Sequence, residues 1–268
     1  MGIPIYQVDS FTEVPFRGNP AGVCIPGVPR DDSWMQSVAR EMNLSETAFI
    51  ERREDGFGLR WFTPTVEVEL CGHATLASAH ILWEAGLLEP GEDARFHSRS
   101  GLLTARGRAG EIELDFPETP AERAAPPPGL CEALGVKPRF VGLSRFDYLV
   151  EVGSEDEVRA TAPDFVELRT LGVRGVIVTA VSSSPEFDFV SRFFAPGAGI
   201  DEDPVTGSAH CTLAPYWGEK LGKTDMNAYQ ASARGGRLEV RLRGDRVLLA
   251  GRAVTVLRGE LVEREREA

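Results

Sequence analysis

The stretch Gly72–Glu84 reads GHATLASAHILWE, and almost every position in it carries a small or apolar side chain. A helix that is apolar on every face is a buried helix, not a surface helix. A related stretch follows 135 residues later, where Gly207-Ser208-Ala209 falls on Gly72-His73-Ala74. The sequence therefore predicts two central helices, over residues 72–84 and 206–221, each covered by other elements.

Further matches keep nearly the same offset on both sides of these helices. Gly101-Leu102-Leu103 falls on Gly236-Arg237-Leu238, and Trp61–Pro64 resembles Phe193–Pro196. Short strand candidates and hairpins flank both helices, including residues 46–52, 59–62, 101–116, 175–181, 189–194 and 238–249. Strands joined by tight turns favour a mainly antiparallel α+β fold over a Rossmann sheet. We expect two pseudo-repeated halves, each with a sheet wrapped round its central helix.

A Pro-rich stretch near the middle of the chain predicts the boundary between the halves. We expect the first half over residues 1–118, a linker over 119–128, the second half over 129–262 and a charged tail over 263–268.

Composition excludes several classes of protein. The net charge of −12 argues against a nucleic-acid partner. No apolar run approaches the ~18 residues of a membrane span, and a secretory signal pattern is absent. The four cysteines are widely spaced, which is typical of free thiols in a reducing cytoplasm and not of disulfides or a zinc site. No complete dinucleotide fingerprint or phosphate loop occurs, so we expect neither a cofactor nor a metal.

Both predicted central helices follow an acidic loop, Val66–Cys71 in one half and Gly199–Thr206 in the other. A helix N-terminus carries unpaired N–H groups and a partial positive charge, which bind carboxylates. Two such starts facing each other across an interdomain cleft would hold a small anionic molecule. Alternatively, Asp203 or Thr206 only caps its helix, and His73 is only a core residue.

Glu46 is the candidate acid–base residue. It lies in the polar stretch Asn43–Thr47, which leads into an apolar strand. A carboxyl group in a closed cleft loses hydration, which shifts its pKa toward values suited to proton transfer. The alternative is a solvated strand edge.

Four motifs together resemble the phenazine-biosynthesis PhzF-like family. They are FRGNPAGV at 16–23, NLSETAF at 43–49, LCGHAT at 70–75 and GIDEDPVTGSA at 199–209. The resemblance runs from about Ile3 to Leu261. It implies the diaminopimelate epimerase-like fold, in which two half-barrels each close round a central helix.

The resemblance also implies cofactor-independent proton transfer by an isomerase, with a homodimer as the assembly. Glu46 matches the family's catalytic glutamate, and His73, Asp203 and Ser208 match its polar substrate-contacting residues. We therefore expect catalytic roles for Glu46, His73 and Asp203. The expected substrate-binding residues, which include backbone amides at both helix starts, are Gly72, Gly207, Ser208, Asn19 and Cys71.

Two other functions stay open at this point. The chain could be a carboxylate-binding or regulatory protein without catalysis, or a racemase that depends on Cys71. Related epimerases use one cysteine from each half, but here Asp203-Pro204 occupies the place of the second cysteine and Cys211 lies several residues later. The sequence does not name the substrate.

Overall fold

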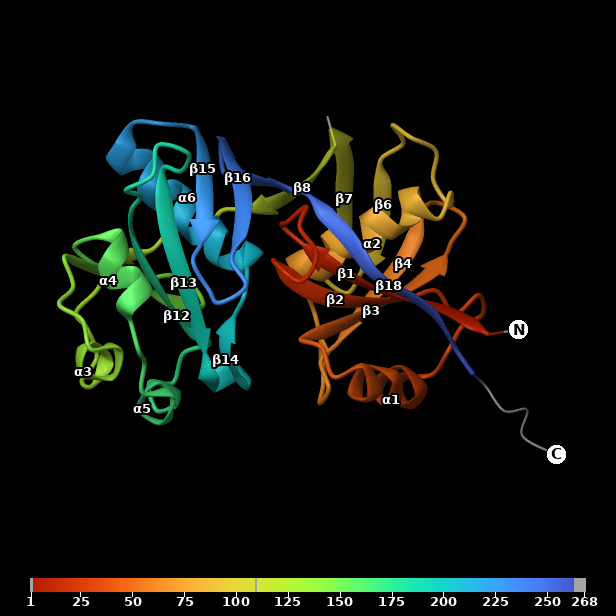
Figure 1. Cartoon of the computed structure of the whole chain (residues 1–268), viewed down its shortest axis with the longest axis horizontal. Coiled ribbons are helices and arrows are strands. Elements are labelled where there is room, and N and C mark those ends of the chain that lie inside the picture. Colours follow the sequence, from red (N-terminus) through yellow and green to blue (C-terminus); the bar gives the residue numbers. More distant parts are fainter. Residues whose placement is uncertain (1, 109, 263–268) are drawn as a thin grey trace. The chain divides into compact units, whose positions relative to one another are not determined.

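The computed structural model describes residues 2–108 and 110–262 and divides the chain into two compact units (Figure 1). Unit 1 takes the described residues of 1–114 and 251–268, and unit 2 takes residues 115–250. Both units mix helices with many strands, in agreement with the α+β class. Within the described ranges, no helix is long and apolar enough to cross a membrane.

Unit 1 is a mainly antiparallel sheet with a central helix. Strand β1 pairs antiparallel with β2, β2 parallel with β3, β3 antiparallel with β4, and β4 parallel with β6. The hairpin of β7 and β8 continues from β6, and β5 pairs with β4. The elements are β1 (Ile3–Ser10), β2 (Asn19–Cys24), α1 (Asp32–Met42), β3 (Glu46–Arg52), β4 (Phe57–Phe62), β5 (Glu67–Val68), α2 (Gly72–Glu84), β6 (Ala94–Ser98), β7 (Gly101–Arg108), β8 (Glu111–Pro117) and β18 (Ala253–Leu261).

Unit 2 repeats this order of pairings. Strand β10 pairs antiparallel with β11, β11 parallel with β12, β12 antiparallel with β13, and β13 parallel with β15, followed by β16 and β17. The two units therefore share one topology, as the sequence repeat predicts. The elements are β9 (Glu122–Arg123), α3 (Leu130–Leu134), β10 (Phe140–Leu143), β11 (Asp147–Glu151), α4 (Glu155–Ala160), α5 (Phe165–Arg169), β12 (Gly175–Val181), β13 (Phe189–Ala195), a 3-10 turn (Pro196–Ala198), β14 (Ile200–Asp203), α6 (Gly207–Leu221), β15 (Asp225–Gln230), β16 (Gly236–Arg243) and β17 (Arg246–Gly251).

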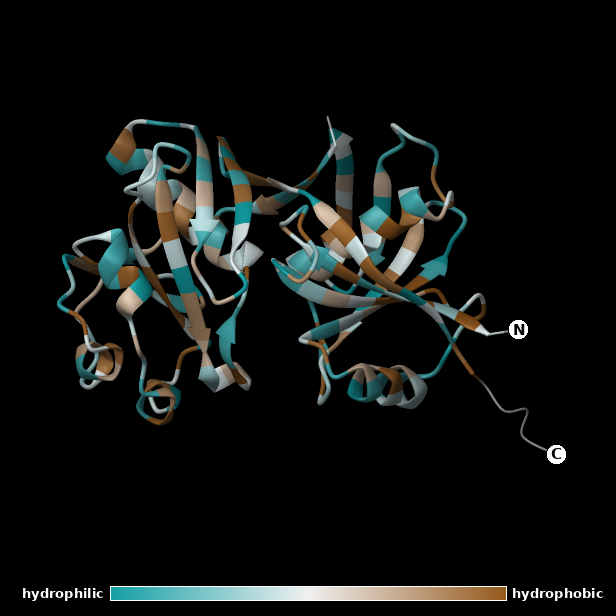
Figure 2. Ribbon diagram, in the orientation of Figure 1, coloured by the Kyte–Doolittle hydropathy of each residue, from teal (hydrophilic) through white to brown (hydrophobic). Residues whose placement is uncertain are grey.

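The central helices are buried because they carry few polar side chains. In α2, every residue from His73 to Ala79 is buried, and the helix contacts β1, β2, β3, β7 and β18. In α6, nine residues are buried, and the helix contacts β15 and β16. Helix α1 differs, because hydrophilic and hydrophobic residues alternate along it (Figure 2) and its buried residues are Met35, Val38 and Ala39.

The observed boundaries differ from the predicted ones. The expected linker over 119–128 belongs to unit 2, where β9 pairs with β10 and the amide of Thr119 donates to the Cys211 carbonyl at 3.0 Å. The predicted second half, 129–262, is also wrong at its end, because β18 returns to unit 1 and pairs with β1. Each sheet is thus completed by a strand that follows the last hairpin of the other unit. The predicted tail over 263–268 lies outside the described residues.

Candidate active site

Near the start of helix α2, strand β1 ends and its neighbours β2 and β3 begin. Ser10 of β1 pairs with Asn19 of β2, and Ala21 of β2 pairs with Glu46, the first residue of β3. Helix α1 ends at Met42, and the left-handed conformation of the next residue, Asn43, turns the chain toward β3. Asparagine tolerates this conformation better than most residues. The sheet register therefore brings Asn19 and Glu46 to one end of unit 1.

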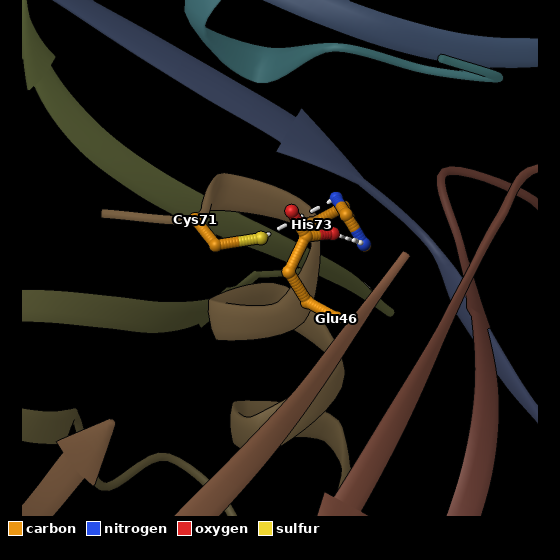
Figure 3. A group of neighbouring side chains, drawn as sticks. All are labelled: Glu46, Cys71 and His73. Atoms are coloured by element: carbon orange, nitrogen blue, oxygen red, sulfur yellow. Dashed lines mark hydrogen bonds and ion pairs between the residues drawn. The ribbon is translucent and has the colours of Figure 1, made fainter. Parts of the chain in front are cut away.

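Glu46, Cys71 and His73 point toward one another there (Figure 3). The His73 Nε2 atom lies 3.2 Å from Glu46 Oε2, and the Cys71 Sγ atom lies 3.5 Å from His73 Nδ1. The side chains of His73 and Glu46 are 6% and 12% exposed. The three residues come from β3, from the residue before α2 and from its first turn. The structure thus groups three of the residues that the sequence singled out.

Burial keeps His73 neutral. Loss of hydration lowers the pKa of its imidazole to about 3. The Asn19 side-chain nitrogen lies 3.2 Å from His73 Nδ1. Because an amide nitrogen only donates, Nδ1 is the acceptor and the ring proton lies on Nε2, which faces Glu46. The Glu46 contact has an ion-pair distance without the alignment of a hydrogen bond.

Two further side chains hold the start of α2, and the sequence reasoning missed both. Ser10 Oγ donates to the His73 carbonyl at 2.8 Å, and Thr75 Oγ1 donates to the Cys71 carbonyl at 2.6 Å. Thr75 belongs to the motif LCGHAT at 70–75, so its position two residues after His73 could have identified it from the sequence. Ser10 carried no signal, because its contact depends on tertiary structure.

Asn19 was expected to contact the substrate, and that role is untested. The structure places its fully buried side chain against His73. This contact gives Asn19 a positioning role, because it fixes which ring nitrogen of His73 carries the proton.

The residues that precede the two central helices do not cap them with their side chains. Cys71 precedes α2 and Thr206 precedes α6, and neither side chain caps its helix. The alternative that Thr206 serves only as a cap is therefore wrong. Uncapped N–H groups at a helix start are suited to an anionic ligand.

Asp203 and its neighbours form a second polar cluster, within unit 2. Thr206 Oγ1 donates to the Asp203 carboxylate, and the buried Gln230 bridges the two residues. Its side-chain nitrogen donates to the Asp203 carbonyl at 2.7 Å, while its side-chain oxygen accepts from the Thr206 amide at 2.8 Å. Gln230 lies at the end of β15, outside the motifs that the sequence analysis identified. Ser208 is half-buried and Gly207 is buried at the start of α6.

His210 lies one turn further along α6. It is fully buried, its Nδ1 lies 2.8 Å from the Thr206 carbonyl, and burial lowers its pKa to about 4. Nδ1 therefore donates to this carbonyl, since a neutral ring has one N–H and a carbonyl only accepts.

The thiols differ in their surroundings. Burial raises the pKa of Cys211 to about 12, so its thiol stays protonated at neutral pH. Cys71 is the thiol that contacts a polar side chain of the candidate site.

Glu46, Cys71 and His73 are also the one group of three possible ligands, within residues 2–108 and 110–262, whose donor atoms lie within 4.8 Å of one another. However, Cys71 approaches Nδ1 of His73 and Glu46 approaches Nε2. One metal ion binds one ring nitrogen, so a single ion would not use both contacts.

Comparisons with known proteins agree with the motifs. Residues 8–259 match the family model described as PhzC-PhzF, phenazine biosynthesis-like protein. An uncharacterized isomerase of Halalkalibacterium halodurans is 56% identical over 98% of this chain and 99% of its own length. An uncharacterized isomerase of Pseudomonas aeruginosa is 50% identical over 97% of this chain and 99% of its own.

Solved structures give the same result for the fold. A PhzF-family phenazine biosynthesis protein of Enterococcus faecalis has a TM-score of 0.94 and 42% identity, and the match covers 98% of this chain and 100% of the other. A hydroxyproline epimerase of Agrobacterium vitis has a TM-score of 0.64 at 13% identity, with 97% and 92% coverage, which shows a similar fold alone. Since the family model spans nearly the whole chain and the relatives match over their full length, the chain belongs to the phenazine biosynthesis-like PhzC-PhzF family.

Proposed function

We propose that this member of the family is a cofactor-independent isomerase that moves a proton on a small carboxylated substrate. Isomerase activity agrees with the two relatives that carry this name over their full length. The observation that carries the mechanism is the nearly buried Glu46 carboxyl, 3.2 Å from a neutral imidazole. A side chain of this kind can accept a proton and return it without a cofactor.

In the proposed reaction, the Glu46 carboxylate takes a proton from a carbon next to an unsaturated, carboxylated system. The electron pair of the broken C–H bond moves into the unsaturated system, and the double bond shifts. Glu46 then gives a proton, the abstracted one or one exchanged with solvent, to another carbon, so that substrate and product have the same composition apart from this exchange. The reaction needs no oxidant and no second substrate.

His73 supports this step as a hydrogen-bond donor. Its low pKa excludes an imidazolium at neutral pH, and the Asn19 contact leaves the proton on Nε2. A neutral N–H beside Glu46 can stabilise the carboxylate or polarise the substrate without giving up its proton. Asn19 acts through His73 as a positioning residue.

The substrate carboxylate is assigned to the amides at the helix starts, Gly72-His73 and Gly207-Ser208. Support comes from the two helix starts, because N–H groups of a first helical turn attract anions and neither Cys71 nor Thr206 caps its helix with its own side chain. We further propose that Asp203 acts at the reacting centre and Ser208 in binding. The half-barrel form of each unit and a homodimer are also part of this proposal.

Proton exchange with solvent tests the role of Glu46 directly. A dihydro-hydroxyanthranilate and simple β,γ-unsaturated carboxylic acids are incubated with the protein in D₂O, and deuterium in the product is measured by NMR. We expect Glu46→Gln to lower turnover by about 10²–10⁴-fold, the usual contribution of a general acid–base residue.

Glu51→Gln is the matched control, because Glu51 is an exposed acid in the same strand β3. It should react like the wild-type protein. Wild-type turnover in Glu46→Gln would disprove the assigned role. Acids that stabilise the protein against heat but never gain deuterium would favour the binding-protein alternative.

A further inference from the structure

Unit 2 contains a pocket of about 490 Å³ that none of the proposed catalytic residues lines. Its volume falls within the range of small-molecule sites, about 300–1,000 Å³. One wall comes from the sheet, where Phe140 of β10 lies opposite Glu151 of β11. The other wall is the last part of α6, where Tyr216 and Lys220 are four residues apart and share one helix face.

The acid at the base of this pocket already has its partners. Glu151 is 6% exposed, and its Oε2 accepts from Tyr216 at 2.5 Å and from Lys220 at 2.6 Å. Desolvation and the neighbouring Glu151 raise the pKa of Tyr216, so its hydroxyl stays protonated and donates. The charges of Glu151 and Lys220 therefore offset each other.

Two arginines at the pocket have no such partner. Arg123 and Arg139 are exposed, and neither lies within ion-pair distance of a carboxylate in the part of the chain that the structure describes. This is unusual for a chain with a net charge of −12, in which many of the other arginines pair with acids. Glu219 is the remaining charged group of the lining. The pocket thus has a local excess of positive charge.

Arg123 is also held in a defined position. Its guanidinium lies over the Phe140 ring, 4.8 Å from the centroid, and Phe140 in turn contacts the Tyr216 ring at 4.9 Å. A guanidinium stacked on a ring keeps its N–H edges free for the two oxygens of a carboxylate or phosphate. The aromatic side chains provide an apolar surface for the rest of such a ligand.

We propose that this pocket is a second ligand site, which binds a small organic oxyanion: a carboxylate or a phosphate monoester with a compact apolar body. Arg123 and Arg139 hold the oxyanion, and Phe140 and Tyr216 contact the body. None of the proposed catalytic residues lines this site, so a failure of the isomerase mechanism would not exclude ligand binding here, and the reverse also holds.

Calorimetric titration of the full chain with three probes tests the proposal. Phenyl phosphate and benzoate carry the two oxyanions, and benzyl alcohol has the same ring without charge. We expect one or both anions to bind and benzyl alcohol to bind at least tenfold more weakly. The stronger anion identifies the ligand class. Binding should weaken as salt rises, because the attraction is between charges. Equal binding of the alcohol, or no binding of either anion at millimolar concentration, would overturn the proposal.

Four variants locate the bound anion. Arg123→Gln and Arg139→Gln should each weaken binding about tenfold, and Arg123→Lys should lie between Arg123→Gln and the wild type because it keeps the charge but loses the two-point contact. Glu219→Gln should strengthen binding, since it removes a negative charge.

Two further variants serve as controls. Arg145→Gln should bind like the wild type, because Arg145 also stacks on an aromatic ring, that of Phe146, yet does not line the pocket. Ser208→Leu, which should weaken carboxylate binding at the proposed active site, should also bind these anions like the wild type. Unchanged affinity in both Arg123→Gln and Arg139→Gln would contradict the site. So would loss of binding in Ser208→Leu, which would place the anion at the proposed active site instead.

Discussion

The two units share a topology but differ at one corner. In unit 1, β3 begins with Glu46, next to β2, and the first turn of α2 provides His73. In unit 2, the equivalent strand β12 begins with Gly175, paired with Asp147 of β11, and the first turn of α6 provides Ser208. Both units therefore have the same fold, but only unit 1 has the candidate acid–base pair, Glu46 and His73.

The corner of unit 2 has no room for a side chain at position 175. A Cβ atom on Gly175 would lie 2.5 Å from the Phe193 ring and 2.8 Å from the Phe194 carbonyl. Beside it, the buried Asp147 forms an ion pair with Arg174, whose guanidinium lies over the Phe193 ring. Packing occupies the place that Glu46 has in unit 1. The comparison teaches that one fold can use the same position for chemistry in one unit and for stability in the other.

Among the variants that compare the two units, those at Asp203 and Ser208 should have the largest effect, and they test whether unit 2 contributes to the reaction. Asp203→Asn should lower turnover by about 10²-fold, a typical loss when one group that acts in the transition state is removed. Ser208→Leu should mainly raise KM, because its proposed role is binding. Steady-state kinetics on an accepted substrate separates the two effects.

Asp201→Asn is the control for this pair, since Asp201 is an exposed acid in the same strand β14. It should leave kcat and KM unchanged. If Asp203→Asn altered only affinity and Ser208→Leu altered only turnover, the two roles would be exchanged.

The next prediction concerns stability at the corner of unit 2. Gly175→Ala should lower the free energy of unfolding by about 1–3 kcal/mol, the usual cost of overpacking. Urea denaturation measures this. Gly107→Ala is the matched control in a strand of unit 1, where the nearest atom to an added Cβ is 3.9 Å away. Equal stability of the two variants would show that the corner of unit 2 can rearrange.

Both central helices carry a buried histidine, and this predicts a common dependence on pH. The pKa values of His73 and His210, about 3 and about 4, lie below the ordinary value of 6.5 because burial disfavours the charged ring. Below pH 6.5 the unfolded chain binds protons that the folded chain does not bind. The folded state therefore loses stability as pH falls from 6.5 toward 4, by up to roughly 1 kcal/mol per pH unit for each histidine.

Replacement of either histidine should make this loss smaller. Denaturation midpoints of His73→Gln and His210→Gln between pH 6.5 and 5 should change less with pH than those of the wild type. Slopes as steep as in the wild type would mean that neither ring is kept neutral by the fold.

The sequence predicted local features better than long-range ones. The central helices and the strands at 46–52 and 175–181 could be predicted because their apolar patterns are local, and the repeat of Gly72-His73-Ala74 related the two units. The position of β18 could not be predicted, because it pairs with β1, at the other end of the chain. Strand β9 was missed because its two residues lie in a Pro-rich stretch and carry no strand pattern.

The candidate site shows the same limit. Motifs singled out Glu46, Cys71 and His73, and the sheet register brings them together. Ser10 and Gln230 could not be predicted as site residues, because a single polar residue at a strand end does not differ in sequence from an ordinary surface residue. Their roles depend on which helix start the fold places beside them.

The smallest expected effect compares the thiol of unit 1 with that of unit 2. Cys71→Ser should keep turnover within about threefold of the wild type, and Cys211 is excluded as its acid–base partner by a pKa of about 12. The reason for the small effect lies at His73, because Nδ1 has one lone pair and the Asn19 amide can donate to it at 3.2 Å. Removal of the Sγ atom at 3.5 Å leaves that hydrogen bond in place.

Cys131→Ser, at a partly exposed thiol in α3, is the control and should also react normally in the deuterium assay. Loss of exchange in Cys71→Ser alone, together with inactivation of the wild type by iodoacetamide, would instead support the racemase and assign the proton transfer to the thiol.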